Sequence, residues 1–126
     1  MQIVRDGISD PASAQPYLRV APVISTSVTR GDTVYLSGVL ASSPGDVRSQ
    51  TAQVLQRIDQ LLAAAGTDKS RLLTAQVWLA DMATFVDHNE AWNEWVDPAN
   101  PPVRVCVEAR LVHPARHVEI MVTAAR

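Results

Sequence analysis

Near the middle of the chain, nine consecutive residues read Leu72-Leu73-Thr74-Ala75-Gln76-Val77-Trp78-Leu79-Ala80. Side chains alternate between the two faces of a strand, so one face of this segment would carry Leu73, Ala75, Val77 and Leu79. The other face would carry Leu72, Thr74, Gln76 and Trp78. Because both faces are largely apolar, the segment is predicted to be a central strand of a sheet.

Amphipathic helices are predicted on both sides of this strand in the sequence. From Val47 to Ala65, apolar residues recur at spacings of three and four, which predicts a helix with Asp46 as its N-terminal cap. Gly66 follows as the expected left-handed residue at the end of that helix. A second helix is predicted from about Ala83 to Val96, with Asp81 as its cap.

Four further segments have the composition or alternation of strands. A hairpin is predicted from Val23–Thr29 and Thr33–Ser37, and later strands from Val103–Ala109 and His117–Ala124. The order β-β-α-β-α-β-β predicts an α+β fold whose two strand–helix–strand crossovers create parallel pairings in a mixed sheet. Two helices can cover only one face of such a sheet.

Length and composition favour one compact domain spanning residues 1–126. Residues 1–22 carry several prolines and small polar residues, so an irregular arm or edge strand is expected there. A net charge of −2 argues against nucleic-acid and membrane-surface partners. The single cysteine, Cys106, excludes an intrachain disulfide and is typical of a reducing compartment. With no secretory signal or membrane span recognised, a cytoplasmic location is expected.

The sheet face without helices is predicted to be an interface. It would carry apolar residues such as Trp78, Cys106 and Met121, which is more apolar area than a monomer usually exposes. We therefore predict a closed homo-oligomer packed through this face. Clefts between its subunits would be natural ligand sites.

Arg104 is the first candidate for chemistry, because its neighbours along the strand are valines. A guanidinium in such a place needs an anionic partner, and its planar array of donors suits a small carboxylate. The alternative is a structural ion pair with Glu119 or Glu108. Cys106 lies on the same strand face, where a thiol is more often a small buried group than a nucleophile.

Glu119 is the second candidate, since it stands between Val118 and Ile120 in an apolar strand. A desolvated glutamate has a raised pKa and can transfer protons near neutral pH. In one cleft, Arg104 and Glu119 could hold a carboxylate and protonate the adjacent carbon, or they could merely neutralise each other. Pro114 between His113 and His117 indicates a loop, so no metal or cofactor is predicted.

Several segments carry a resemblance to a known family, and they occur in its order: 32–38, Leu79-Ala80-Asp81-Met82 leading to Phe85 and Asn89, then 102–111 and 118–120. Across residues 21–124 the chain resembles the RidA/YjgF family of reactive-intermediate (enamine/imine) deaminases. The resemblance implies a chorismate-mutase-like fold, a homotrimer with clefts between subunits, and no cofactor or metal.

The same resemblance implies a reaction. In such proteins the arginine matching Arg104 binds the carboxylate of a 2-imino or 2-enamino acid, and water displaces ammonia to leave a 2-oxo acid. The glutamate matching Glu119 handles protons, the residue matching Cys106 contributes mainly through its backbone, and the asparagine matching Asn89 lies near the pocket. A non-catalytic protein that binds or senses a 2-oxo acid in the same cleft is the alternative.

One segment departs from the family pattern. Typical members have Gly-Pro-Tyr-Ser before the first strand, where this chain has Pro22-Val23-Ile24-Ser25. Ile24 therefore takes the place of the tyrosine that walls the pocket, Ser25 is retained, and Tyr17 lies seven positions earlier. A different or broader pocket is expected. RNA cleavage has also been attached to relatives, but the acidic net charge argues against it.

Overall fold

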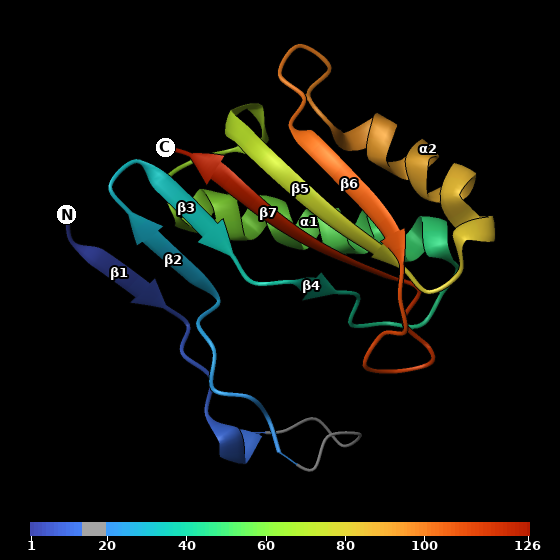
Figure 1. Cartoon of the computed structure of the whole chain (residues 1–126), viewed down its shortest axis with the longest axis horizontal. Coiled ribbons are helices and arrows are strands. Elements are labelled where there is room, and N and C mark those ends of the chain that lie inside the picture. The colour runs from blue at the N-terminus through green and yellow to red at the C-terminus, as the bar shows by residue number, and fades with distance from the viewer. Residues whose placement is uncertain (14–19) are drawn as a thin grey trace.

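The computed structural model describes residues 1–13 and 20–126, which form a mixed sheet with both helices on one face (Figure 1). The strands are β1 (Ile3–Asp6), β2 (Ser27–Arg30), β3 (Thr33–Leu36), β4 (Val39–Leu40), β5 (Leu72–Leu79), β6 (Val103–Glu108) and β7 (Val118–Ala125). The helices are α1 (Val47–Ala64) and α2 (Phe85–Trp95), with 3₁₀ turns at Pro11–Ser13, Lys69–Arg71 and Met82–Thr84. The predicted α+β class is confirmed, and Tyr17 lies outside the described residues.

The strand order is β1-β2-β3-β7-β5-β6, with β4 paired to β7. β5 is an interior strand with β7 on one side and β6 on the other, in line with the prediction that it does not lie at an edge, and it pairs in parallel with β6 across the α2 crossover. The prediction of a second parallel pairing was wrong, because β7 lies between β3 and β5 and is antiparallel to both. β1 forms an edge against β2, which is one of the two alternatives expected for residues 1–22, whereas the two-residue β4 was not predicted.

The predicted hairpin is present, with Gly31 at a φ of 59° in its two-residue loop. Glycine adopts this conformation without the penalty that a Cβ would bring. Its first strand begins at Ser27 rather than Val23. The backbone before it pairs instead with the N-terminal arm, since Ser9 N donates to Ile24 O (2.9 Å) and Ile24 N donates to Ser9 Oγ (3.0 Å).

Both ends of α1 match the sequence prediction. Asp46 Oδ1 accepts a hydrogen bond from Ser49 N at 2.8 Å, which satisfies one free backbone donor of the first turn. Gly66 has a φ of 82°, and the backbone N–H groups of Gly66 and Thr67 donate to Ala63 O and Leu62 O. This pair of hydrogen bonds is the Schellman arrangement.

Gly66→Ala is expected to lower the free energy of unfolding by about 1 kcal/mol, because alanine resists a positive φ. A Cβ at this position would have no atom within 4 Å, so the loss arises from the backbone and not from a clash. Urea denaturation of both proteins measures the difference. A midpoint equal to that of the native chain would contradict this explanation.

The core lies between the helices and the covered face of the sheet. Its fully buried side chains come from the sheet and from α1, and include Leu36, Val77, Leu79, Ile120, Leu55, Ile58 and Leu62. The predicted alternation along β5 fails at one position. An irregularity in the pairing between Leu72 and Thr74 turns Leu73 outward, where it is 46% exposed, and leaves Leu72 in the core.

The opposite face is open and largely apolar. It exposes Tyr35, Val103, Val105, Val107 and Met121, beside a half-buried Trp78. Cys106 does not lie on this face, contrary to prediction. It is aligned with Val77 of β5 and packs against the core from the helix-covered side, so the valines of β6 point outward instead.

Candidate functional site

Arg104 lies under α2, on the covered face of the sheet. Its Nη2 donates a hydrogen bond to Asn89 Oδ1 at 2.9 Å, and its Nη1 is 3.3 Å from His88 Nε2. The guanidinium carbon lies 5.1 Å from the ring centre of Trp92 and 5.9 Å from that of Phe85, both within cation–π range. The structure thus brings together two predicted site residues, Arg104 and Asn89.

All of these partners of Arg104 are uncharged. The ion pairs found among residues 1–13 and 20–126 belong to Arg48, which binds Glu90 and Glu94. The predicted alternative, an ion pair of Arg104 with Glu108 or Glu119, is therefore wrong within the described chain. Two of the five guanidinium N–H groups are used, which leaves three donors and a full positive charge for an anionic ligand.

His88 is a member of this cluster that the sequence analysis missed. Its side chain is fully buried, and its Nδ1 is 3.0 Å from Thr51 Oγ1 of α1. Burial, with a smaller contribution from the positive charge of Arg104, lowers the pKa of His88 to about 4. A sequence signal existed, because His88 follows Phe85 by three residues and precedes Trp92 by four, so all three share one helix face.

This pKa predicts a stability loss in mild acid. An unfolded histidine has a pKa of about 6.5, so between pH 6.5 and 4 the unfolded chain takes up a proton that the native chain excludes. Stability should therefore fall as the pH falls through this window, by roughly 2 kcal/mol from His88 alone. His88→Gln should lose that part of the pH dependence, which urea denaturation at pH 7.5 and 4.5 would measure. Equal pH dependence in both proteins would contradict the assignment.

Cys106 lies two residues from Arg104 on the same strand face. Burial raises the pKa of its thiol, and the positive charge of Arg104 only partly opposes this effect. The thiol is therefore mainly protonated at neutral pH, which disfavours a role as nucleophile. This agrees with the expectation that Cys106 is a small packing group rather than a nucleophile.

Glu119 lies on the open face of the sheet, aligned with Trp78 of β5 and Leu40 of β4. Burial raises the pKa of its carboxyl group. The carboxyl lies against Gly38, where a Cβ would overlap Oε2. Glycine at position 38 therefore leaves room for the acid.

Ile24 and Ser25 lie in the segment before β2. Ile24 lines a pocket of about 300 Å³ together with Ser37 and Gly38, so it shares a wall with the glycine that touches Glu119. Ser25 is half-buried beside it in the chain. The structure thus places Ile24 and Glu119 near one another, on the Gly38 side of the molecule.

Arg104 and Glu119 do not meet within one chain. Arg104 is aligned with Ala75 and Glu119 with Trp78, and these two residues of β5 point to opposite faces of the sheet. The two side chains therefore share no cleft within a single chain, and the expectation of a cleft between subunits stays a prediction. Each chain instead carries two separate groups, a cationic one under α2 and an acidic one on the open face.

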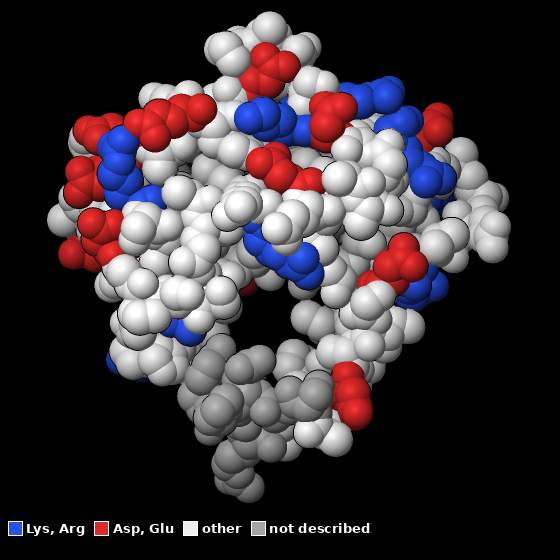
Figure 2. Space-filling view, turned by 180° about the vertical axis from the view of Figure 1, so that it is seen from behind, with Lys and Arg blue, Asp and Glu red and all other residues white. Residues whose placement is uncertain are grey.

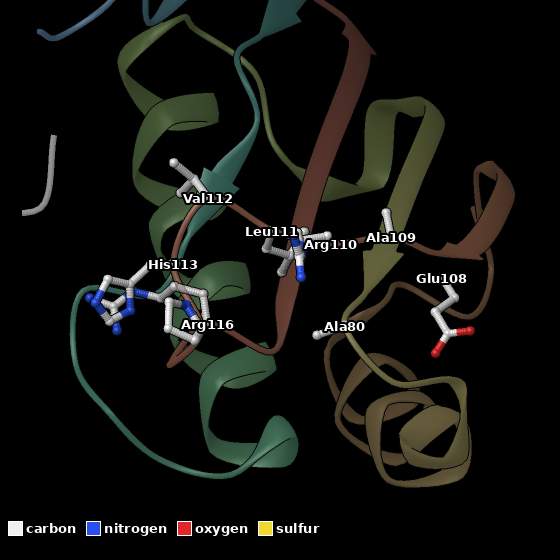
Figure 3. A pocket seen from close by; sticks show the side chains of 9 residues that line it. Ala80, Glu108, Ala109, Arg110, Leu111, Val112, His113 and Arg116 are labelled. Atoms are coloured by element: carbon white, nitrogen blue, oxygen red, sulfur yellow. The ribbon is translucent and has the colours of Figure 1, made fainter.

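A pocket larger than the one at Ile24 lies elsewhere. It has a volume of about 630 Å³ and lies below the ends of β5 and β6, with Ala80 and the segment from Glu108 to Arg116 around it (Figure 3). Glu108 stands on one side of it, and His113 and Arg116 on the other. None of the predicted site residues lines this pocket. No cluster of three metal-binding side chains occurs in the described parts of the chain.

Charges on the helix-covered side are mixed. Figure 2 shows Lys and Arg side chains interspersed with Asp and Glu over this face. Such a surface lacks the uniform positive potential typical of proteins that bind a nucleic-acid backbone. Within the described residues, no helix has the length and apolar character needed to cross a bilayer.

Comparison with known proteins agrees with this architecture. The family described as Endoribonuclease L-PSP matches residues 8–126. The crystal structure of NMB1025 from Neisseria meningitidis, described as a member of the YjgF protein family, superposes with a TM-score of 0.86 at 35% identity, covering 100% of this chain and 96% of that one. The chain belongs to the RidA/YjgF family.

Sequence relatives carry the related name RutC. A RutC family protein of Haemophilus ducreyi is 46% identical over 99 residues, which cover 79% of this chain and 85% of the relative. The RutC family protein YoaB of Escherichia coli is 40% identical over 101 residues, covering 80% and 89%. RidA/YjgF membership confirms the resemblance, and the fold is the chorismate-mutase-like one that it implied.

Proposed function

We propose that this RidA/YjgF protein hydrolyses small, reactive 2-imino and 2-enamino acids to 2-oxo acids and ammonia. The observation that carries the proposal is the half-buried Arg104, whose hydrogen-bond partners are neutral. A guanidinium held in this way keeps its charge for a ligand carboxylate, which it can bind through two parallel hydrogen bonds. Every substrate of this class carries such a carboxylate beside the reacting carbon.

Glu119 supplies the proton transfers. In its acid form it protonates the terminal carbon of an enamine, which gives the iminium form of the imine. As a carboxylate it accepts a proton from water while the water oxygen bonds to the imino carbon. It returns that proton to nitrogen, and as the C–N bond breaks and the C=O bond forms, the Glu119 carboxylate takes up the hydroxyl proton. Ammonia and a 2-oxo acid are released, and Glu119 is again in its acid form. A pKa raised by burial suits this exchange near neutral pH.

The complete site is proposed to lie between two copies of the chain. Arg104 and Glu119 lie on opposite sheet faces, so one copy would provide the arginine and the next the glutamate. The exposed apolar residues of the open face, such as Val103, Val105 and Met121, supply a surface for the contact. A cyclic homotrimer repeats this pairing and completes every site.

Ile24 is proposed to form part of the wall of the pocket that receives the side chain of the substrate. It is 49% exposed and lines the same pocket as Gly38, which touches Glu119. An aliphatic wall without a hydroxyl favours apolar substrate side chains. The imines of aliphatic amino acids are therefore the first substrates to try.

A coupled assay tests the activity. A dehydratase acting on serine generates 2-aminoacrylate, and an amino-acid oxidase acting on alanine generates 2-iminopropionate. The protein should accelerate pyruvate formation and reduce the yield of the semicarbazide adduct. Binding of 2-oxobutyrate without acceleration of either reaction would favour the non-catalytic alternative, in which the cleft binds or senses a 2-oxo acid.

A further inference from the structure

His88 contacts Arg104, the proposed carboxylate anchor, although His88 itself would not touch the substrate. We infer that His88 is a positioning residue, which accepts a hydrogen bond from Arg104 and holds its guanidinium ready for the ligand carboxylate. The inference rests on the proposed function, because it assigns to His88 the positioning of Arg104 within that site. It concerns a side chain that forms no part of the proposed cleft.

The hydrogen bonds of His88 determine its tautomer. Arginine has only donors, so a hydrogen bond between Arg104 Nη1 and His88 Nε2, which lie 3.3 Å apart, requires that Nε2 carry no proton. The ring proton then sits on Nδ1 and is donated to Thr51 Oγ1, at 3.0 Å. Thr51 is itself fully buried, so this hydrogen bond is protected from water and holds the ring in place.

Neighbouring positions on α2 hold the guanidinium at two points. His88 meets Nη1 and Asn89 meets Nη2, while the ring of Trp92 lies against the guanidinium from the same helix. Two acceptors and an aromatic surface fix both the place and the plane of the group. A side chain fixed before binding loses less conformational entropy when a carboxylate arrives.

His88 can accept this hydrogen bond only while its ring is neutral. Within the described residues, Arg104 of β6 is the charged group that acts on the ring, and α1 presents the neutral Thr51. A protonated, positively charged ring would present an N–H group at Nε2 in place of an acceptor. It would repel the positively charged guanidinium of Arg104. Burial keeps the pKa of His88 at about 4, so the ring stays neutral and the acceptor persists down to mild acid.

A trio of variants tests the inference by titrating the protein with 2-oxobutyrate, the stable product analogue. His88→Leu fills the space but offers no acceptor, and its dissociation constant should rise about tenfold. His88→Gln restores an acceptor that reaches Arg104, and should bind within about threefold of the native chain. Thr51→Val leaves Nδ1–H without its partner and should give an intermediate loss. In the imine assay, the loss in His88→Leu should appear in KM rather than kcat, because the reacting groups are intact.

An NMR measurement on the native chain gives a readout that needs neither activity nor variants. Long-range nitrogen–proton correlations of the His88 ring should show a protonated Nδ1 and an unprotonated Nε2 at pH 7. A protonated Nε2 would overturn the inference, as would equal affinity in His88→Leu and the native chain. If the native chain binds no 2-oxobutyrate, the proposed function fails, while the ring tautomer still decides whether His88 holds Arg104.

Discussion

Arg104→Ala is expected to weaken 2-oxo acid binding by about 100-fold and to lower kcat/KM for imine hydrolysis by a similar factor. The change removes a charge-assisted pair of hydrogen bonds, whose truncation typically has effects of this size. It also leaves His88 Nε2 and Asn89 Oδ1 without their donor. Calorimetric titration with 2-oxobutyrate and the coupled imine assay measure the two losses.

Arg104→Lys separates charge from geometry. A lysine keeps the positive charge, but its single ammonium cannot meet His88, Asn89 and both carboxylate oxygens in the planar arrangement of a guanidinium. It should recover only a small part of the lost affinity. Arg48→Ala is the matched control, because Arg48 is a half-exposed arginine that binds Glu90 and Glu94 on the outer surface of the helices. Native affinity in Arg104→Ala would rule out its role as carboxylate anchor.

Glu119→Gln is expected to lower kcat by about 100-fold or more while 2-oxobutyrate affinity changes little, because general acid–base catalysis contributes this much. The glutamine amide keeps the size of the side chain, but it can act neither as a carboxylic acid that donates a proton nor as a carboxylate that accepts one. Gly38→Ala should lower kcat as well, since its Cβ would displace the carboxyl group. Turnover at the native rate in Glu119→Gln would exclude it as the proton-transfer group.

Mixing two inactive variants tests whether the site spans two copies. Chains with Arg104→Ala and chains with Glu119→Gln, refolded together in equal amounts, should regain about a quarter of native activity. In a cyclic oligomer, that is the chance that an intact arginine faces an intact glutamate. Each variant refolded alone is the control. No recovery in mixed oligomers would show that both groups serve one site from the same chain.

Local features of the fold could be predicted from the sequence because local chemistry determines them. The cap at Asp46, the left-handed Gly66 and the two-residue loop at Gly31 depend on interactions within a few residues. The crossover through α2 and the interior place of β5 also followed from the pattern, since a strand that is apolar on both faces must lie inside a sheet.

Other features depend on contacts between distant segments. Alternation along β6 showed that Arg104 and Cys106 share a face, but not that this face lies under α2. Apolar valines normally face a core, and here they point outward on the open face. The separation of Arg104 from Glu119 likewise follows from the register of β5 with β6 and β7. The periodicity of the sequence does not determine the register between strands.

His88 was missed for a related reason. The neighbouring Asn89 was singled out through the family resemblance, and the histidine one position before it was passed over. Helix periodicity places His88 on one face with Phe85 and Trp92, but it does not show what that face contacts. Only the placement of β6 beneath α2 shows that His88 and Asn89 hold the same guanidinium.

The opposed placement of Arg104 and Glu119 has a consequence for how activity should depend on protein concentration. If a site forms only between copies, an isolated chain has no complete site and mass action governs catalysis as well as assembly. Specific activity would then be constant at high concentration and collapse on dilution below the dissociation constant of the oligomer. A cell making too little of the protein would cross a threshold and lose activity out of proportion to the number of chains.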